Sequence, residues 1–141
     1  MAAERRAEVV WQGNLFQGSG TVSLGSGVIS QQPVTWAART EQPDGKTSPE
    51  ELIAGAHAAC YAMALSNTLA EHGHTPEQLE VTAVCTFDPP KITTVELTVR
   101  GRVPGLDDAT FKQIAQEGEQ NCPVSNALRN NVDIRVTAEL E

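Results

Sequence analysis

The sequence predicts an α+β fold built around one long helix. Strand-like segments lie before and after a single long apolar segment, residues 48–72, and a second helical segment precedes the last strand. Strands and helices that are segregated along the chain favour an antiparallel sheet over a doubly wound parallel one. The long segment is apolar on nearly all sides, and such a helix is surrounded by protein. We therefore expect it to pack tightly against a second helix or a wrapped sheet.

The first 40 residues are predicted to form short strands joined by tight turns. A strand-like run begins at residues 8–11, and glycines recur between β-prone residues in 13–27, which favours a meander. These glycines do not match the pattern GxGxxG ahead of a helix, so a nucleotide-binding loop is only weakly indicated. Residues 33–40, PVTWAART, alternate as another strand, which places Arg39 near a strand end.

Individual residues fix the start and the end of the long helix. Ser48 is a suitable N-cap, Pro49 fits the first helical position, and Glu51 completes a capping box. The helix is expected to end at about His72, because Gly73 is a natural C-terminal stop.

The second half of the chain is predicted to contain a strand pair, two helices and a final strand. The segments 79–88 and 91–103 alternate and are separated by two prolines, so they are expected to pair as antiparallel strands. Helical spacing follows over 106–120, then a short helix that ends at Leu128, and the last strand spans 132–140.

Composition excludes several classes of protein. The 141 residues are expected to form one domain, 1–141, and 10 basic against 18 acidic residues argue against a nucleic-acid or anionic-membrane partner. Three cysteines do not make a disulfide scaffold, and no secretory signal is visible, so we expect a reducing, cytoplasmic location. Residues 52–69 approach membrane-spanning length but include polar side chains, which favours a buried helix.

Cys60 lies near the middle of the long helix. The helix dipole acts only within the first turn, so it cannot lower the pKa of this thiol, and a thiolate there needs another activating group. Because cysteine is among the most buried residue types, an ordinary core residue is one interpretation. His57, one helical turn earlier, is either a base for Cys60 or a histidine hydrogen-bonded to a neighbouring strand.

The other two cysteines differ in their surroundings. Cys122 directly precedes a predicted helix start, where the amides of Val124 and Ser125 would point toward its sulfur and favour a thiolate. A turn cysteine without a role is the alternative. Cys85 lies in the strand 79–88 and is expected to be a buried structural thiol.

A metal site has little support in the sequence. The chain contains neither a CxxC pair nor HExxH, and two histidines separated by one glycine at a helix end are usually solvated. The residues that a zinc site would have to use are His57, Cys60, Cys122 and either His72 or His74.

Two cysteine-containing segments resemble the same protein family. TSPEELIAGAHAACYAMALS, residues 47–66, resembles the signature of the OsmC/Ohr family of thiol-dependent hydroperoxide reductases, and NCPVSNAL, residues 121–128, resembles that family's second cysteine motif. The resemblance covers most of the chain. His57 stands where the organic-hydroperoxide-resistance branch usually carries tyrosine, which is typical of the OsmC branch. Ser48 replaces the family's usual asparagine, one capping residue for another.

The resemblance implies roles for four residues. Cys60 would be the peroxidatic cysteine, which becomes a sulfenic acid, and Cys122 the resolving cysteine, which condenses with it to a disulfide. Arg39 would stabilise the Cys60 thiolate and polarise the peroxide, and Glu50 would hold the guanidinium by a bidentate pair. An external dithiol, of lipoyl type in part of the family, would reduce the disulfide.

The resemblance also implies antiparallel sheets wrapped around the long central helix, an obligate intertwined homodimer, and no metal or other cofactor. The expected function is a peroxidase that reduces organic hydroperoxides, hydrogen peroxide or both through Cys60 and Cys122. Two alternatives remain on the same fold, a thiol–disulfide exchange protein and a non-enzymatic, stress-associated binding protein.

Overall fold

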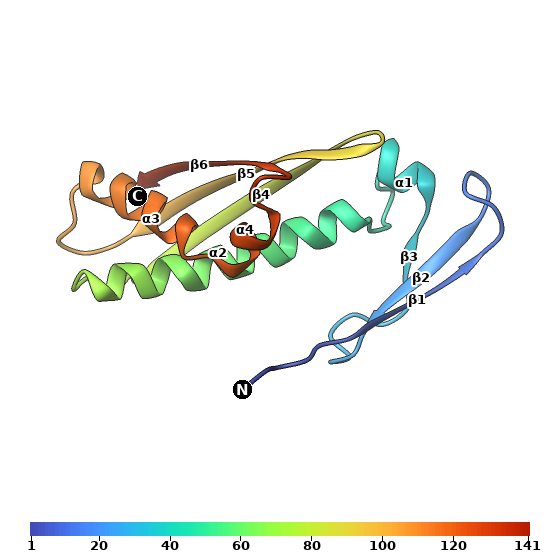
Figure 1. Ribbon diagram of the computed structural model, residues 1–141, viewed down its shortest axis with the longest axis horizontal. Coiled ribbons are helices and arrows are strands. Elements are labelled where there is room, and N and C mark those ends of the chain that lie inside the picture. The colour runs from blue at the N-terminus through green and yellow to red at the C-terminus, as the bar shows by residue number, and fades with distance from the viewer. The chain divides into compact units, whose positions relative to one another are not determined.

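The computed structural model describes all 141 residues, which form two compact units, Met1–Leu52 and Ile53–Glu141. Figure 1 labels the elements along the chain. In order they are β1 (Ala7–Gln12), β2 (Ser19–Leu24), β3 (Gln32–Val34), α1 (Trp36–Thr40), α2 (Pro49–Glu71), β4 (Gln78–Asp88), β5 (Lys91–Arg102), α3 (Asp108–Gln120), α4 (Pro123–Leu128) and β6 (Asp133–Leu140).

The first unit contains a three-stranded antiparallel sheet in the order β1-β2-β3. The predicted meander over residues 13–27 is confirmed in part, since β2 occupies Ser19–Leu24 and pairs with β1. Gly20 lies against the ring of Trp11, where a Cβ would come within 2.8 Å of a ring carbon. All six residues of β1 are exposed in this chain.

The predicted strand over residues 33–40 is wrong beyond Val34. The chain turns into the short helix α1, because the Thr35 side chain caps it by accepting a hydrogen bond from the Ala38 amide at 3.1 Å. Ala37, Ala38 and Arg39 are good helix formers, although residues 33–40 alternate in sequence as a strand would. Arg39 therefore lies on a helix and not at a strand end.

Helix α2 begins and ends as its sequence predicts. The Ser48 hydroxyl accepts a hydrogen bond from the Glu51 amide at 3.1 Å, and Gly73 follows the helix with a φ of 84°. The reciprocal half of the expected capping box is replaced, because the Glu51 carboxylate accepts from the Thr47 hydroxyl at 2.7 Å. None of the chain's helices combines the length and the hydropathy that a bilayer-spanning segment needs.

In the second unit, β4 and β5 form the predicted antiparallel pair, and β6 joins β5 in parallel. The parallel pairing arises because α3 and α4 carry the chain back to the end at which β5 began, so β6 runs in the same direction. Figure 1 shows α2 along one side of this sheet, with α3 and α4 beside it.

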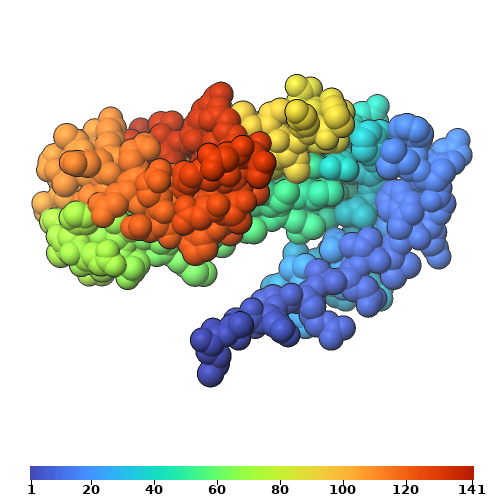
Figure 2. All heavy atoms as spheres, in the orientation of Figure 1, coloured from blue at the N-terminus to red at the C-terminus, as the bar shows by residue number.

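The core of the second unit lies between α2, α3 and the sheet. In Figure 2 the orange and red atoms of α3 and α4 lie directly beside the green atoms of α2. The close approach of α3 to α2 depends on Gly118, where a Cβ would lie 3.1 Å from the Leu65 backbone. The side chains that are almost fully buried come from all three layers: Tyr61, Leu65, Leu69, Val95, Leu97, Val99, Phe111, Ile114 and Ala115.

This chain does not cover every side of α2. Gly55, Ala56, Ala59 and Met63 are exposed, and Met63 is 72% accessible. The prediction that protein surrounds the helix is therefore confirmed on the side of α2 that packs against the core, whereas a stripe of small and apolar residues stays exposed in this chain.

Candidate active site

Cys60 and Cys122 come together in the second unit. Cys60 lies on α2 and is partly exposed, whereas Cys122 is the residue before α4 and is fully buried. Both are thiols, Cys60 packs against the buried cluster that contains Cys122, and the nearby Cys122 side chain raises the pKa of Cys60. A disulfide needs the two sulfurs to approach to about 2.05 Å with suitable Cβ directions. The packing therefore brings together two thiols that are well separated in the sequence and that an oxidant such as a peroxide could join.

The turn between α3 and α4 positions Cys122. The Cys122 amide donates to the Glu119 carbonyl at 3.2 Å, which closes the end of α3, and Pro123 then starts α4. The Cys122 carbonyl accepts from the Asn126 amide at 2.9 Å, so the backbone of Cys122 is fixed on both sides.

The amides at the start of α4 do not act as the sequence predicted. The Cys122 side chain makes no capping hydrogen bond, so the expected stabilisation of a Cys122 thiolate by Val124 and Ser125 is wrong. The backbone N–H of Val124 instead acts on Cys60, where it lowers the pKa of the thiol. The reason is geometric: the start of α4 lies against α2, so its amide faces the neighbouring helix.

The surroundings of Cys60 hold its thiol protonated. Burial raises the pKa of Cys60, the Val124 amide opposes this by lowering it, and the contact with Cys122 raises it further. A thiolate at Cys60 therefore needs a positive charge or another donor in addition to Val124.

Arg39 and Glu50 form a bidentate ion pair in the first unit. Arg39 Nε lies 3.0 Å and 3.1 Å from the two carboxylate oxygens of Glu50, and Nη2 lies 2.9 Å from Oε2. Glu50 is buried in the first turn of α2, and the Arg39 guanidinium also lies 5.7 Å from the centre of the Trp36 ring. Three bonds to a buried carboxylate give the guanidinium one fixed orientation.

The four site residues predicted from the sequence thus appear as two pairs. Cys60 and Cys122 are in contact in the second unit, and Arg39 and Glu50 are paired in the first. The two pairs differ in chemistry: the first holds two thiols, which can form a disulfide by giving two electrons to an oxidant, and the second holds a cation at a fixed orientation.

His57 is fully buried one turn before Cys60. Its Nε2 lies 2.6 Å from the Ser125 hydroxyl, and its Nδ1 has no partner. Burial lowers the pKa of His57, partly opposed by the charge of Glu119, so the ring is neutral. Neither sequence-based interpretation describes it: the ring bonds to α4, and not to Cys60 or a strand. Ser125 was missed as a partner, although its position three residues after Cys122 mirrors that of His57 before Cys60.

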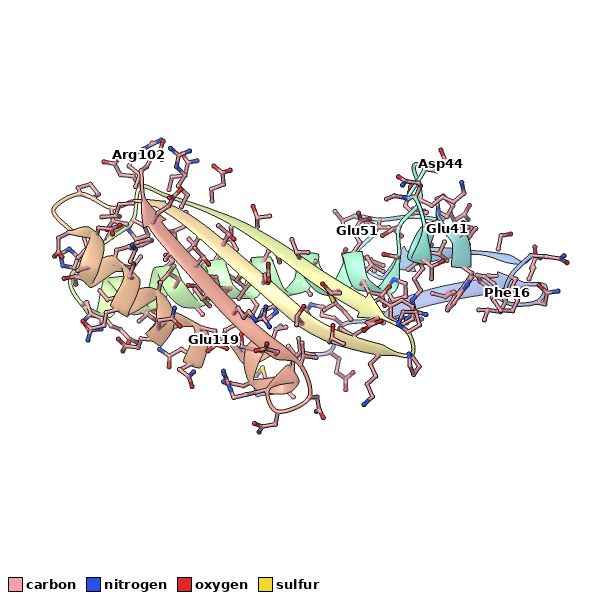
Figure 3. The ribbon with its side chains drawn as sticks, turned by 90° about the horizontal axis from the view of Figure 1, so that it is seen from above. Phe16, Glu41, Asp44, Glu51, Arg102 and Glu119 are labelled. Atoms are coloured by element: carbon pink, nitrogen blue, oxygen red, sulfur yellow. The ribbon has the colours of Figure 1, made fainter.

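A buried ion pair at the α3–α4 junction was also missed. Arg129 Nη1 donates to both carboxylate oxygens of Glu119, at 2.9 Å and 3.2 Å, and Gln120 Nε2 donates to Oε2 at 2.9 Å. Figure 3 shows Glu119 at the end of α3, where the chain passes into α4. Nothing in the local sequence marks Glu119 as buried, because its partner lies ten residues later.

The other candidate residues from the sequence, Cys85 and His72, are not part of the pair formed by Cys60 and Cys122. Cys85 faces the core side of β4, opposite Val95 in the register, as the alternation predicted, but it is partly and not fully buried. His72 is bonded to Glu117 at 2.8 Å on the surface. No group of three or more His, Cys, Asp or Glu side chains in the 141 residues is arranged to hold a metal ion.

Comparison with protein-family models shows which family the chain belongs to. The model described as OsmC-like protein matches residues 42–137, which include Glu50, Cys60 and Cys122. The chain belongs to the OsmC-like family. The family prediction made from the two cysteine segments is therefore confirmed.

Two relatives of this OsmC-like protein have different names, one a peroxiredoxin and the other an organic hydroperoxide resistance protein. Peroxiredoxin OsmC of Escherichia coli (strain K12) is 41% identical over 138 residues, which cover 95% of this chain and 96% of the relative. An organic hydroperoxide resistance protein of Xanthomonas axonopodis pv. citri (strain 306) is 31% identical over 93 residues, covering 64% and 66%.

Solved structures support the same fold. The organic hydroperoxide resistance protein OhrB of Bacillus subtilis is 26% identical, with a TM-score of 0.70 over 96% of this chain and 98% of that one. An organic hydroperoxide resistance protein of Elizabethkingia anophelis has a TM-score of 0.73 over the full length of both chains at 22% identity, which supports the fold alone. The predicted α+β, OsmC-like fold is confirmed.

Proposed function

We propose that this OsmC-like protein reduces hydroperoxides through a cycle in which Cys60 is oxidised first and Cys122 resolves it. The chain is a cysteine-based hydroperoxide reductase, in line with relatives named peroxiredoxin and organic hydroperoxide resistance protein. The observation that carries the assignment of the two residues is the contact between their thiols, one partly exposed and one buried.

The exposure of the two thiols suggests the order of reaction. Cys60 is the partly exposed thiol, so it meets the peroxide, and its thiolate attacks one peroxide oxygen. The O–O bond breaks, the leaving oxygen takes a proton as an alcohol or water, and Cys60 becomes a sulfenic acid. The buried Cys122 then attacks the sulfenic sulfur, releasing water and forming a disulfide.

The last step returns the protein to the dithiol state. An external dithiol attacks the disulfide, forms a mixed disulfide and leaves with the oxidising equivalents as its own disulfide. We propose a lipoyl-type dithiol for this role and a reducing, cytoplasmic location. Thiols that must be reduced again after each turnover fit such a compartment.

Arg39 and Glu50 are proposed as the activating pair. Burial raises the pKa of Cys60, so the thiolate needs a cation, and a guanidinium is the cation whose charge and donors also suit a peroxide oxygen. The bidentate bonds from the buried Glu50 support the role, because they remove the freedom that an arginine side chain otherwise has.

We further propose that the protein is a single-domain chain that forms an obligate, intertwined homodimer. The exposed apolar residues support a second copy: Met63 on α2 is 72% accessible, Phe16 73% and Val9 57%. Light scattering should give twice the chain mass of 15.1 kDa. A monomer at micromolar concentration would contradict this assembly.

The assignment of Cys60 is tested by thiol-dependent consumption of an organic hydroperoxide and of hydrogen peroxide. Cys60→Ser should abolish turnover of both, whereas Cys85→Ser, which changes a cysteine on the core side of β4, should retain it. Turnover by Cys60→Ser would refute the assignment. Reduction of a disulfide substrate without any peroxide activity would favour the thiol–disulfide exchange alternative.

A further inference from the structure

A buried hydrogen bond beside the two thiols has no role in the cycle described so far. His57 on α2 and Ser125 on α4 are both completely inaccessible, and His57 Nε2 lies 2.6 Å from Ser125 Oγ. The bond joins residues 68 positions apart in the sequence, so it forms only when α4 is seated on α2.

The bond connects the same two segments as the thiol contact does. His57 precedes Cys60 by three residues and Ser125 follows Cys122 by three residues. Residues three apart on a helix lie on the same side, one turn from each other. The hydrogen bond and the thiol contact are therefore two adjacent links between α2 and the region that starts α4.

The histidine is costly as a purely structural residue. Its ring is buried in the neutral form, and Nδ1 has no hydrogen-bond partner, so one polar atom is left unsatisfied. An apolar side chain of similar volume fills such a position without that penalty. The bond from Nε2 to Ser125 is the polar contact that the ring retains, which indicates that this bond is what the position requires.

Other interactions are made at the two ends of α4. Helix α4 has only six residues, and at its C-terminal end Arg129 donates to Glu119 on α3. At the other end, the Val124 amide reaches Cys60. Asn121, in the turn before α4, also donates to Thr68 of α2 at 3.1 Å. The bond from His57 to Ser125 is therefore the side-chain link between α2 and α4 itself, since Arg129 ties α4 to α3.

We propose that His57 is a positioning residue for disulfide formation, and that its hydrogen bond to Ser125 keeps α4 seated on α2 so that Cys122 stays within reach of the Cys60 sulfenic acid. This inference rests on the proposed Cys60–Cys122 cycle. In the step concerned, the Cys122 sulfur attacks the sulfenic sulfur, the S–S bond forms and the S–O bond breaks. The Cys122 sulfur is oxidised, the Cys60 sulfur is reduced, and the departing hydroxide takes the Cys122 proton as water.

The consequence is protection against over-oxidation. A sulfenic acid that waits longer for Cys122 meets a second peroxide and becomes a sulfinic acid, which dithiols do not reduce. Loss of the hydrogen bond should therefore slow the second chemical step and raise the sulfinic fraction, while the first oxidation of Cys60 stays unchanged.

The test is a single-turnover experiment with reduced, full-length protein. One equivalent of hydroperoxide is mixed in, samples are quenched with an alkylating reagent, and intact mass gives the sulfenic, disulfide and sulfinic forms over time. His57→Leu and Ser125→Ala should each slow disulfide formation about fivefold to tenfold, the change expected for one buried hydrogen bond. The double variant should be no slower than either single one, because both remove the same bond.

His57→Gln is the control that separates positioning from folding. Its side-chain amide can donate to Ser125 Oγ, so it should restore disulfide formation to near the wild-type rate. Variants that slow both chemical steps equally, or that leave the sulfinic fraction unchanged, would overturn the proposal. If His57→Leu does not fold, Ser125→Ala alone decides between these outcomes.

The same experiment separates failure of this inference from failure of the proposed function. A wild-type protein in which Cys60 is never oxidised would refute the cycle itself. A wild-type protein that forms the disulfide, with Ser125→Ala forming it equally fast, would refute only the role of His57.

Discussion

The ion pair between Arg129 and Glu119 should be worth far more than an ordinary surface salt bridge. The side chain of Glu119 is only 6% accessible and that of Arg129 31%, with Nη1 at 2.9 Å and 3.2 Å from the two carboxylate oxygens. Arg129→Met removes the cation and leaves a buried carboxylate with Gln120 as its remaining side-chain donor. Loss of one partner of a buried pair costs about 3–5 kcal/mol.

We expect the lower end of that range, about 3 kcal/mol, because Arg129 keeps some contact with water. For a chain of this length, such a loss lowers the melting temperature by roughly 10 °C. The measurement is thermal and denaturant unfolding, at one fixed protein concentration so that any association contributes equally.

Two further variants make the interpretation specific. Arg135→Met removes a pair with Asp133 that is more than half exposed on both sides, so it should cost less than about 1 kcal/mol. Replacing Glu119 and Arg129 together by Met should recover most of the loss, because no charge then remains buried. Equal stability of Arg129→Met and Arg135→Met would refute the reasoning.

Two other predictions concern the chemistry of Cys60. Burial raises its pKa and Arg39 is proposed to oppose this, so Arg39→Met should move the rise in Cys60 alkylation rate to higher pH, slowing alkylation at neutral pH by about tenfold or more. An unchanged pH profile would contradict that role. Cys122→Ser should react with peroxide once and then accumulate sulfinic acid at Cys60 on mass spectrometry. Reduced Cys60 after peroxide treatment would contradict the resolving role.

The local signals in the sequence predicted most elements correctly. Ser48 and Gly73 marked the two ends of α2, and strict alternation gave the β4–β5 pair. These signals succeed because caps and alternation act within a few residues. The same reliance on short range explains the error at Arg39, where Thr35 caps a helix inside a segment that alternates like a strand.

Features that depend on residues far apart were not accessible from the sequence. The parallel direction of β6 follows from the path of α3 and α4, which no single segment encodes. The Val124 amide lowers the pKa of Cys60 and does not cap Cys122, because α4 is seated against α2. The partners of His57 and Glu119 likewise become apparent only after folding. Nothing in the sequence distinguishes Arg129 from a surface residue, and the spacing of Ser125 after Cys122 does not by itself identify His57 as its partner.

The most direct test of the account is the disulfide itself. Reduced wild-type protein is treated with one equivalent of hydroperoxide, alkylated, digested and mapped by mass spectrometry under non-reducing conditions. The thiol contact between Cys60 and Cys122 predicts one intramolecular disulfide between them, with Cys85 recovered in alkylated form. Alkylated Cys60 at the end of the reaction, or a disulfide that joins Cys60 to Cys85, would contradict the central claim.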